Sequence, residues 1–279
     1  MDLEQLLGRA HDLGEEGDWE GAAELLRDHL DDFDDVPSVH CWLGVAEREL
    51  GLEGVAYERF KRALSFDPED PYVLATAGNA IAAFDDPDAE RVLRTAALIA
   101  PHVPLARMMY GAYLAREGFH EDAMRELNAA RALDPDEPQI AYEAGVARAL
   151  AGEIDAAADL LADAVRLDPD EGWARIVFGL VLLEADRPEE GAGELLSGAR
   201  LRDDDLEAQL VAALAACAIG QDGTAYEMVE RARLSALEGD IALIADIEER
   251  VDAGPESAAS FLRDDFAPDV LRTRLQERP

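Results

Sequence analysis

The chain has 279 residues, of which 49% are hydrophobic, so it is long enough and apolar enough to bury a sizeable core. Its 62 Asp and Glu residues against 25 Lys and Arg residues give a formal net charge of −37. This charge would repel nucleic-acid phosphates and anionic lipid surfaces, and the mixing of acid with apolar residues argues against a disordered acidic tail.

From its first residues onward the chain alternates two kinds of predicted helix, which recur with a spacing of 33 or 34 residues. The first helix of each pair carries a small residue inside an apolar pattern. This series is Ala10, Gly44, Gly78, Gly111, Gly145, Gly179 and Ala213. Glycine inside a helix costs about 1 kcal/mol relative to alanine, so its return indicates a close approach. We expect the first helix to lie tightly against the small residues of the second.

The second helix of each pair carries a small residue, a large apolar residue four positions later and usually another small residue three positions after that. The large residues are Leu26, Phe60, Leu93, Leu127, Leu161, Leu195 and Val229. This spacing places all three residues on one helix face. A glycine such as Gly51 or Gly152 closes most first helices, with Asp186 in its place once. Asp-Pro pairs, as at Pro135, end several second helices.

This combination resembles the tetratricopeptide repeat family, and the stretch LARMMYGAYLAREGFHEDAMRELNAARALDP, from Leu105 to Pro135, matches nearly every element of the family motif. The resemblance implies an all-α fold, a right-handed α-solenoid of about seven helix-turn-helix repeats with C-terminal capping helices. The array is expected to cover residues 3–239. Its repeats are predicted at 3–36, 37–70, 71–103, 104–137, 138–171, 172–205 and 206–239.

The remaining residues, 240–279, break the repeat pattern. Asp240 to Gly254 predict one amphipathic helix, whose apolar stripe would cap the last repeat over Val229. Two short helices are predicted to follow, opened near Pro255 and Pro268. The sequence leaves open whether this tail folds back into the groove of the array. The apolar residues that could enter the groove are Phe261, Leu262, Phe266 and Leu271.

No set of residues points to catalysis, a metal or a cofactor, so we predict a protein that is not an enzyme and binds neither. His40 and Cys41 are adjacent on a predicted helix, where neighbouring side chains diverge by about 100°. Cys41 and Cys217 are expected to be buried free thiols. The acidic run at 31–35 lacks the glycine and spaced ligands of a calcium loop, which favours a solvated turn.

In the solenoid that the resemblance implies, the first helices line the inner surface. We predict that inner residues with aromatic, amide or large apolar side chains bind a partner, although the aliphatic ones could instead be core. These residues are Tyr72, Asn79, Met108, Tyr142, Trp173, Ile176 and Leu180. The implied function is a non-catalytic protein–protein interaction scaffold that binds a peptide or helix of another protein in its concave groove. The alternative is a regulatory or assembly subunit of an enzyme complex.

Lysine is almost absent: Lys61 is the only one, and arginine supplies the other 24 of the 25 basic residues. Scarce lysine with abundant acid resembles proteins of salt-in halophiles, and we expect a halophilic archaeon as the source rather than an ordinary cell. The N-terminal residues MDLEQLLGRAHDL lack a basic segment, and the longest apolar run, 210–220, is too short to cross a bilayer. We therefore expect a cytoplasmic protein with no membrane or nucleic-acid partner.

Overall fold

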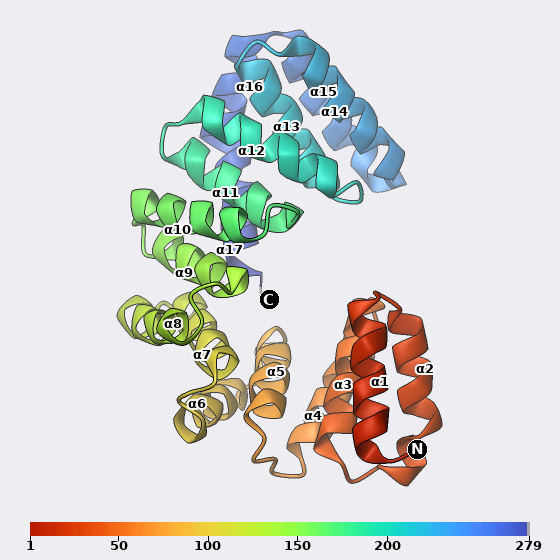
Figure 1. Cartoon of the computed structure of the whole chain (residues 1–279). Coiled ribbons are helices and arrows are strands. Elements are labelled where there is room, and N and C mark those ends of the chain that lie inside the picture. The colour runs from red at the N-terminus through yellow and green to blue at the C-terminus, as the bar shows by residue number, and fades with distance from the viewer. Residues whose placement is uncertain (278–279) are drawn as a thin grey trace. The chain divides into compact units, whose positions relative to one another are not determined.

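A computed structural model describes residues 1–277, and all regular secondary structure in this range is helical (Figure 1). The described residues divide into two compact units, unit 1 at 1–113 and unit 2 at 114–277. The boundary falls within α7 (Pro104–Arg116). None of the described helices is both long enough and apolar enough to cross a membrane. The fold is that expected from the sequence, consecutive helix pairs packed one after another.

Unit 1 contains three complete helix pairs, in which each first helix packs against its second helix, and α2 and α4 also pack against the first helix of the next pair. Its elements are α1 (Leu3–Glu15), α2 (Trp19–Asp28), the 3-10 turn η1 (Leu30–Asp32), α3 (Pro37–Glu49), α4 (Glu53–Leu64), α5 (Pro71–Ala82), α6 (Ala89–Ile99) and the first part of α7. Three apolar clusters within the unit form its core.

Unit 2 continues the pattern and adds the C-terminal helices. Its elements after α7 are α8 (His120–Leu133), α9 (Pro138–Leu150), α10 (Ile154–Leu167), α11 (Gly172–Glu184), α12 (Pro188–Leu201), α13 (Leu206–Ala218), α14 (Asp222–Ser235), η2 (Glu238–Asp240), α15 (Ile241–Asp252), α16 (Pro255–Phe261), η3 (Leu262–Phe266) and α17 (Ala267–Gln276). One continuous apolar cluster runs from α9 to α17, so the C-terminal helices share the core of the repeats.

The glycines of the first helices lie where the second helix approaches most closely. A Cβ atom placed on Gly145 would lie 2.7 Å from Cγ of Leu161, and one placed on Gly179 would lie 2.7 Å from Cγ of Leu195. The Cβ atom placed on Gly179 would also lie 2.9 Å from the backbone oxygen of Gly191. The expected contact with the small residues is therefore present. The space at Gly44, Gly78, Gly145 and Gly179 is filled mainly by the large residue of the motif, a contact that was not predicted from the sequence.

The turns within the pairs use the left-handed backbone conformation that the sequence predicts. Gly51 and Gly152 follow α3 and α9 with φ of 74° and 76°. Asp186, which replaces this glycine after α11, adopts φ 57°. Aspartate enters this region more readily than most residues, so the repeat keeps its turn without glycine.

The C-terminal segment differs from the two separate short helices expected after residue 254. Residues 255–276 form one continuous helical run, with a π-helical turn, η3, between α16 and α17. Pro268 explains the π turn. It has no N–H to donate to the carbonyl of Asp264, and its ring would clash with that carbonyl in a regular α-helix. The local widening avoids both problems and lets the helix continue.

Candidate partner-binding site

The predicted partner-binding residues of unit 1 differ in their exposure. Tyr72 is 57% exposed at the start of α5, where its backbone N–H donates to the capping carboxylate of Asp70. Asn79 and Met108 are buried, with 2% and 4% of their surface exposed. Among these three, only Tyr72 offers side-chain surface to a partner in this structure. A binding role for these residues stays a prediction.

The predicted residues of unit 2 lie on the first helices α9 and α11. Ile176 and Leu180 are fully buried in the core cluster, and Tyr142 is almost fully buried. Trp173 is half-buried, and its indole N–H donates to the hydroxyl oxygen of Tyr142 at 2.7 Å. Burial raises the pKa of Tyr142, so the phenol stays neutral and can keep its place in this hydrogen bond. Tyr142 thus fixes the Trp173 ring.

The chain's own C-terminal helices cover this part of unit 2. We call the surface formed by α9, α11 and α13 the first-helix face of unit 2. The tail, which we define as residues 255–277, lies on it: α16 packs on α13, and α17 packs on α11 and α9. Figure 1 shows α17 reaching back past α11 toward α9. The question that the sequence left open is answered in this structure, because the tail occupies the face.

The tail is held by an apolar stripe that contains one arginine. Val270, Leu271 and Leu275 are buried, and Arg274 lies in the same stripe with 6% of its surface exposed. Residues at these spacings fall on one side of a helix. Leu262 and Leu271 reach the core cluster that also contains Leu180 and the α13 residues. The tail therefore buries apolar surface of the repeats that would otherwise face water.

Arg274 meets two carboxylates and an aromatic ring. Its Nη2 donates to Oδ1 of Asp205 at 2.7 Å and to Oε2 of Glu207 at 3.1 Å. Its guanidinium carbon lies 4.5 Å from the ring centre of Trp173, within cation–π range. Burial alone would lower the pKa of Arg274, but the hydrogen bond and the negative charges raise it above its ordinary value. The side chain is a fully charged cation in a nearly closed site.

A second arginine holds the end of the tail. Nη1 of Arg116 donates to Glu143 at 2.7 Å, and both side chains are buried. Nε of Arg116 donates to the backbone carbonyl of Glu277 at 2.9 Å. A buried ion pair is tolerated when its remaining hydrogen-bonding groups find partners, and the tail carbonyl supplies one of them. The last described residue is thus tied to the start of unit 2.

The tail does not fill the first-helix face completely. A pocket of about 270 Å³ remains between α17, the turn η3 and the ends of α11 and α13. It is lined by Leu180, Leu183, Leu262 and Leu271 among others, with Glu184 and Asp186 at its side. A smaller pocket of about 190 Å³ lies beside Tyr142 at the starts of α9 and α11. Open space therefore remains beside the tail at this end of the face.

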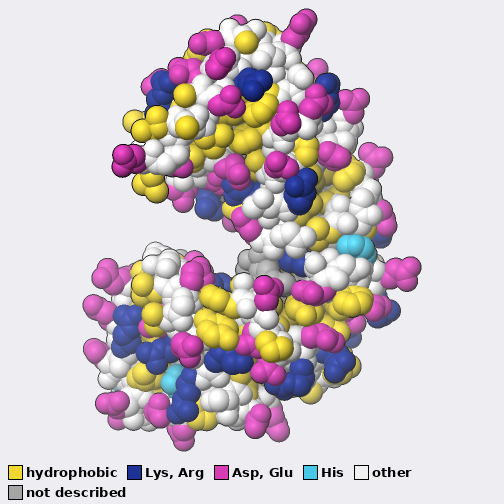
Figure 2. All heavy atoms as spheres, turned by 180° about the vertical axis from the view of Figure 1, so that it is seen from behind, with side chains coloured by type: hydrophobic (Ala, Val, Ile, Leu, Met, Phe, Trp, Pro, Cys, Tyr) yellow, Lys and Arg dark blue, Asp and Glu magenta, His cyan; other side chains and the backbone are white. Residues whose placement is uncertain are grey.

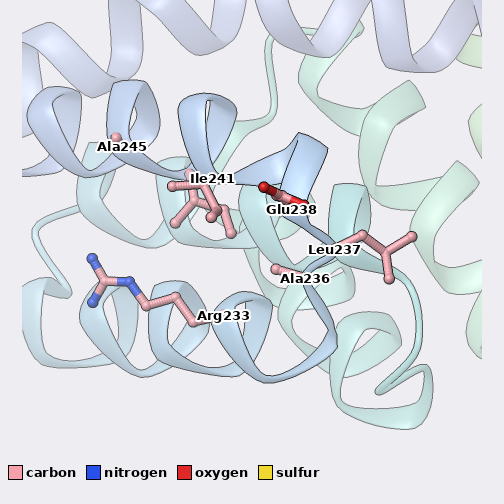
Figure 3. A pocket seen from close by; sticks show the side chains of 7 residues that line it. Arg233, Ala236, Leu237, Glu238, Ile241 and Ala245 are labelled. Carbon is pink, nitrogen blue, oxygen red and sulfur yellow. The ribbon is translucent and has the colours of Figure 1, made fainter.

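Another apolar surface lies where α14 meets α15. Leu234, Leu237 and Ile241 are 88%, 76% and 62% exposed. A pocket of about 370 Å³ opens beside them, and Figure 3 shows Arg233 of α14 and Ile241 of α15 on opposite sides of it. Ile244 and Ile247 are buried against the last repeat together with Val229. Only part of the stripe expected on α15 is therefore covered.

The cysteine and histidine that are adjacent in sequence form no reactive pair. Cys41 is buried, and burial raises the pKa of its thiol to about 12. Such a thiol is almost entirely protonated at neutral pH. The Nε2 atom of His40 lies 2.8 Å from the backbone oxygen of Asp34, and its ring stacks on Phe66. In the part of the chain that the structure describes, no group of three or more potential ligands could hold a metal ion.

Three residues of the site, Asp205, Glu207 and Arg274, were not predicted from the sequence. Asp205 and Glu207 occur in an inter-repeat turn that lacks the usual Asp-Pro pair. They do not stand out there, because acidic residues are common in the inter-repeat turns of this chain. Arg274 carried a usable signal, because it falls on the apolar stripe of an amphipathic helix, a position that a solvent-facing arginine would not occupy. Its partners lie 69 and 67 residues earlier, so no local pattern joins them.

Comparison with known proteins supports the repeat assignment. A model of the tetratricopeptide repeat family matches residues 7–71 and 111–172. Among the curated proteins, none matches this chain in sequence.

Several solved structures are similar in fold. The crystal structure of the APC/C hetero-tetramer Cut9-Hcn1 is similar over 90% of this chain, with a TM-score of 0.72 and 17% identity. This chain covers only 49% of that one, about half its length. A tetratricopeptide repeat protein from Parabacteroides merdae matches 91% of this chain and 98% of its own, with a TM-score of 0.56 and 12% identity. PilF of Pseudomonas aeruginosa matches 71% of this chain and 90% of its own, with a TM-score of 0.57 and 16% identity.

Proposed function

Because this chain has the fold of tetratricopeptide repeat proteins, we propose that it is a non-catalytic interaction scaffold that binds a helix of a partner protein on the first-helix face of unit 2. One observation carries the proposal. The chain's own tail lies on that face as a helix, held by an apolar stripe and by charged side chains at two points. The face therefore supplies the contacts that a helical ligand requires.

The partner's helix would take the place of the tail. Three features support exchange over permanent closure. The tail joins α15 through Ala253 and Gly254, and Gly254 adopts φ 96°, so a glycine junction at which the backbone can turn separates the tail from α15. A pocket of about 270 Å³ remains beneath it. Trp173, one of the three aromatic residues predicted to bind a partner, contacts the tail directly through Arg274.

We place this scaffold in the cytoplasm of a salt-accumulating cell. The single lysine and the acid spread over the surface support this setting (Figure 2). Apolar contacts strengthen in concentrated salt, whereas long-range attraction between charges is screened. A partner helix that buries leucine-like side chains and a shielded ion pair suits such conditions. The negative net charge also disfavours nucleic acid and anionic membranes as partners.

The test is affinity capture with the full chain from a native extract in multimolar salt, followed by binding measurements on the purified candidate. The chains compared are the wild type, Trp173→Ala, and Tyr226→Ala as a control. Tyr226 is an exposed aromatic residue on α14, which is not one of the helices of the first-helix face, and its hydroxyl donates to Asp252 of α15 at 2.7 Å. We expect Trp173→Ala to weaken binding at least about tenfold, as loss of a central aromatic anchor does, and Tyr226→Ala to leave it unchanged. Circular dichroism checks that both variants fold.

Hydrogen exchange on the same complex locates the bound partner. Binding should increase exchange in residues 255–276 and protect α9, α11 and α13. A purified partner that binds Trp173→Ala as tightly as the wild type would contradict the proposal. A partner that leaves exchange of the tail unchanged while protecting only the second helices α10, α12 and α14 would contradict it as well.

A further inference from the structure

We infer that Trp173, Asp205 and Glu207 form an arginine-recognition subsite on the first-helix face of unit 2, and that the partner is an amphipathic helix with an arginine in its apolar stripe. The inference rests on the proposed function and specifies its ligand. The tail supplies the template, since the guanidinium of Arg274 contacts all three residues.

The acidic side of the subsite is positioned without help from the arginine. Asp205 precedes α13, and its Oδ1 accepts the backbone N–H of Ala208 at 3.0 Å, a helix cap. Below it, Nε2 of Gln209 donates to the backbone oxygens of Ala199 and Arg202, which ties the start of α13 to the end of α12. These contacts would remain if the tail left. The carboxylate is therefore held in place before a cation arrives.

The aromatic side of the subsite is also fixed independently. The hydrogen bond from the Trp173 indole to Tyr142, from α11 to α9, sets the ring orientation. Neither residue needs the tail for this contact. A flat ring at 4.5 Å and two carboxylates suit a planar guanidinium, which stacks and donates in its plane. An ammonium group, a compact and more strongly hydrated charge, fits this arrangement less well.

Charge balance also favours a cation there, because Arg202, an arginine of the repeats that lies 5.8 Å from the Trp173 ring centre, pairs with Asp204 instead. Asp205 has only 8% of its side chain exposed, and Glu207 lies beside it with 39%. Two neighbouring carboxylates beside apolar surface are unfavourable without a compensating positive group. Any segment that replaces the tail on this face would therefore have to bring its own cation or leave the pair uncompensated. This requirement distinguishes the ligand from a purely apolar helix.

The position of the arginine relative to its neighbours gives the pattern of the ligand. In the tail, two buried apolar residues, Val270 and Leu271, precede Arg274 by four and three positions, and Leu275 follows it directly. All four lie on one helix face. Arg272, only two positions away, is exposed and pairs with Asp269 of its own helix. The subsite thus selects a ligand helix by the position of its arginine relative to the apolar residues. An arginine elsewhere in the helix, such as one at the position of Arg272, would not reach the subsite.

The experiment uses a synthetic peptide with the sequence of residues 255–277, carrying a fluorescent label, added to the full chain. The full chain bears Arg274→Gln, which weakens its own tail and leaves the subsite intact. Three peptides are compared: the native sequence, Arg274→Gln, and Arg272→Gln as the matched control of equal charge. We expect the native and Arg272→Gln peptides to bind within about twofold of each other, and Arg274→Gln to bind at least tenfold more weakly.

A second chain tests the subsite from its other side. Asp205→Asn and Glu207→Gln, introduced together with Arg274→Gln, keep the shapes of the side chains and the cap at Asp205. In this chain the native and Arg274→Gln peptides should bind with equal affinity. The tenfold difference in affinity between them depends on the interaction of the peptide's arginine with the two carboxylates, which this chain lacks. Retained tenfold discrimination would overturn the assignment of these carboxylates.

Other outcomes separate the two proposals. Equal binding of the Arg274→Gln and Arg272→Gln peptides to the first chain would overturn the arginine subsite and leave helix binding intact. If no peptide binds although hydrogen exchange shows residues 255–276 opened by Arg274→Gln, the proposed function itself fails. If the tail stays protected in that chain and no peptide binds, Arg274 does not hold the tail and the inference is wrong.

Discussion

Lys61, the only lysine of the chain, joins α4 to the turn before α6. Its Nζ lies 2.9 Å from Asp86 and 3.3 Å from Asp88, and the hydroxyl of Tyr57 donates to Asp86 at 2.7 Å. Asp86 lies in the shortened turn that makes one repeat spacing 33 residues. Burial raises the pKa of Asp86, but the hydrogen bonds from Lys61, the Asp88 backbone and Tyr57 outweigh it and lower the pKa to about 2.

Asp86→Asn should lower the free energy of unfolding by about 1–2 kcal/mol at pH 7. The pKa of Asp86 is lowered from 3.8 to about 2 on folding, so its contribution is fully present above about pH 4 and is lost as the pH falls through 2. Urea unfolding of both chains at pH 7, 5 and 3 measures the difference. Asp85→Asn, a neighbouring exposed carboxylate without an ion pair among the described residues, is the control. A difference already absent at pH 5 would contradict this account.

At the scale of the helices, the recurring glycine is a packing device. Gly179→Ala should destabilise unit 2 by about 1–3 kcal/mol, because the added methyl group would meet Leu195 and the Gly191 backbone at 2.7 and 2.9 Å. Gly193→Ala is the matched control on α12, where nothing lies within 4 Å. It should stabilise by about 0.5–1 kcal/mol through helix propensity alone. Chemical denaturation of both variants gives the comparison, and a stable Gly179→Ala chain would refute the role of the contact.

The helices were predictable because every residue that defines a helix pair lies within one repeat of about 34 residues. The small, large and small residues of the second helices, the closing glycines and the substitute Asp186 all lie where the sequence places them. The candidate site was less predictable. Helix register shows which side of α9 or α11 faces away from its second helix, but not what covers that side. Five of the seven residues predicted to contact a partner are buried: Asn79, Met108, Tyr142, Ile176 and Leu180.

The tail shows the physical reason for this limit. Arg274 of the tail pairs with Asp205 and Glu207, which lie more than sixty residues earlier in the chain. The sequence shows that Arg274 lies on an apolar stripe, but not which residues it will meet after folding. Pro268 was expected to open a separate short helix, and this prediction was wrong, because residues 255–276 form one continuous helical run. That the helix would pass the break by a π turn depends on the surface beneath it, which no local signal describes.

At the scale of the whole molecule, the charge of −37 makes the folded chain repel itself. Acidic side chains are spread over the face shown in Figure 2. We expect the melting temperature to rise with KCl and to go on rising above about 1 M, where the screening length is only ~3 Å. Thermal melts in KCl, with sucrose as an uncharged control, measure the effect. An unchanged melting temperature between about 0.1 M and 2 M would refute it.

The tail also changes how unit 2 should fold. In an array of repeats each pair contacts only its neighbours, so stability is close to a sum of local terms and the ends can fray. Arg116 and Glu277 are 161 residues apart, and their contact closes most of the unit into a loop. Such non-local contacts slow folding and join distant pairs into one cooperative block. Lifting the tail would therefore loosen α9, α11 and α13 together, so the proposed exchange of the tail for a partner helix would also change the cooperativity of unfolding.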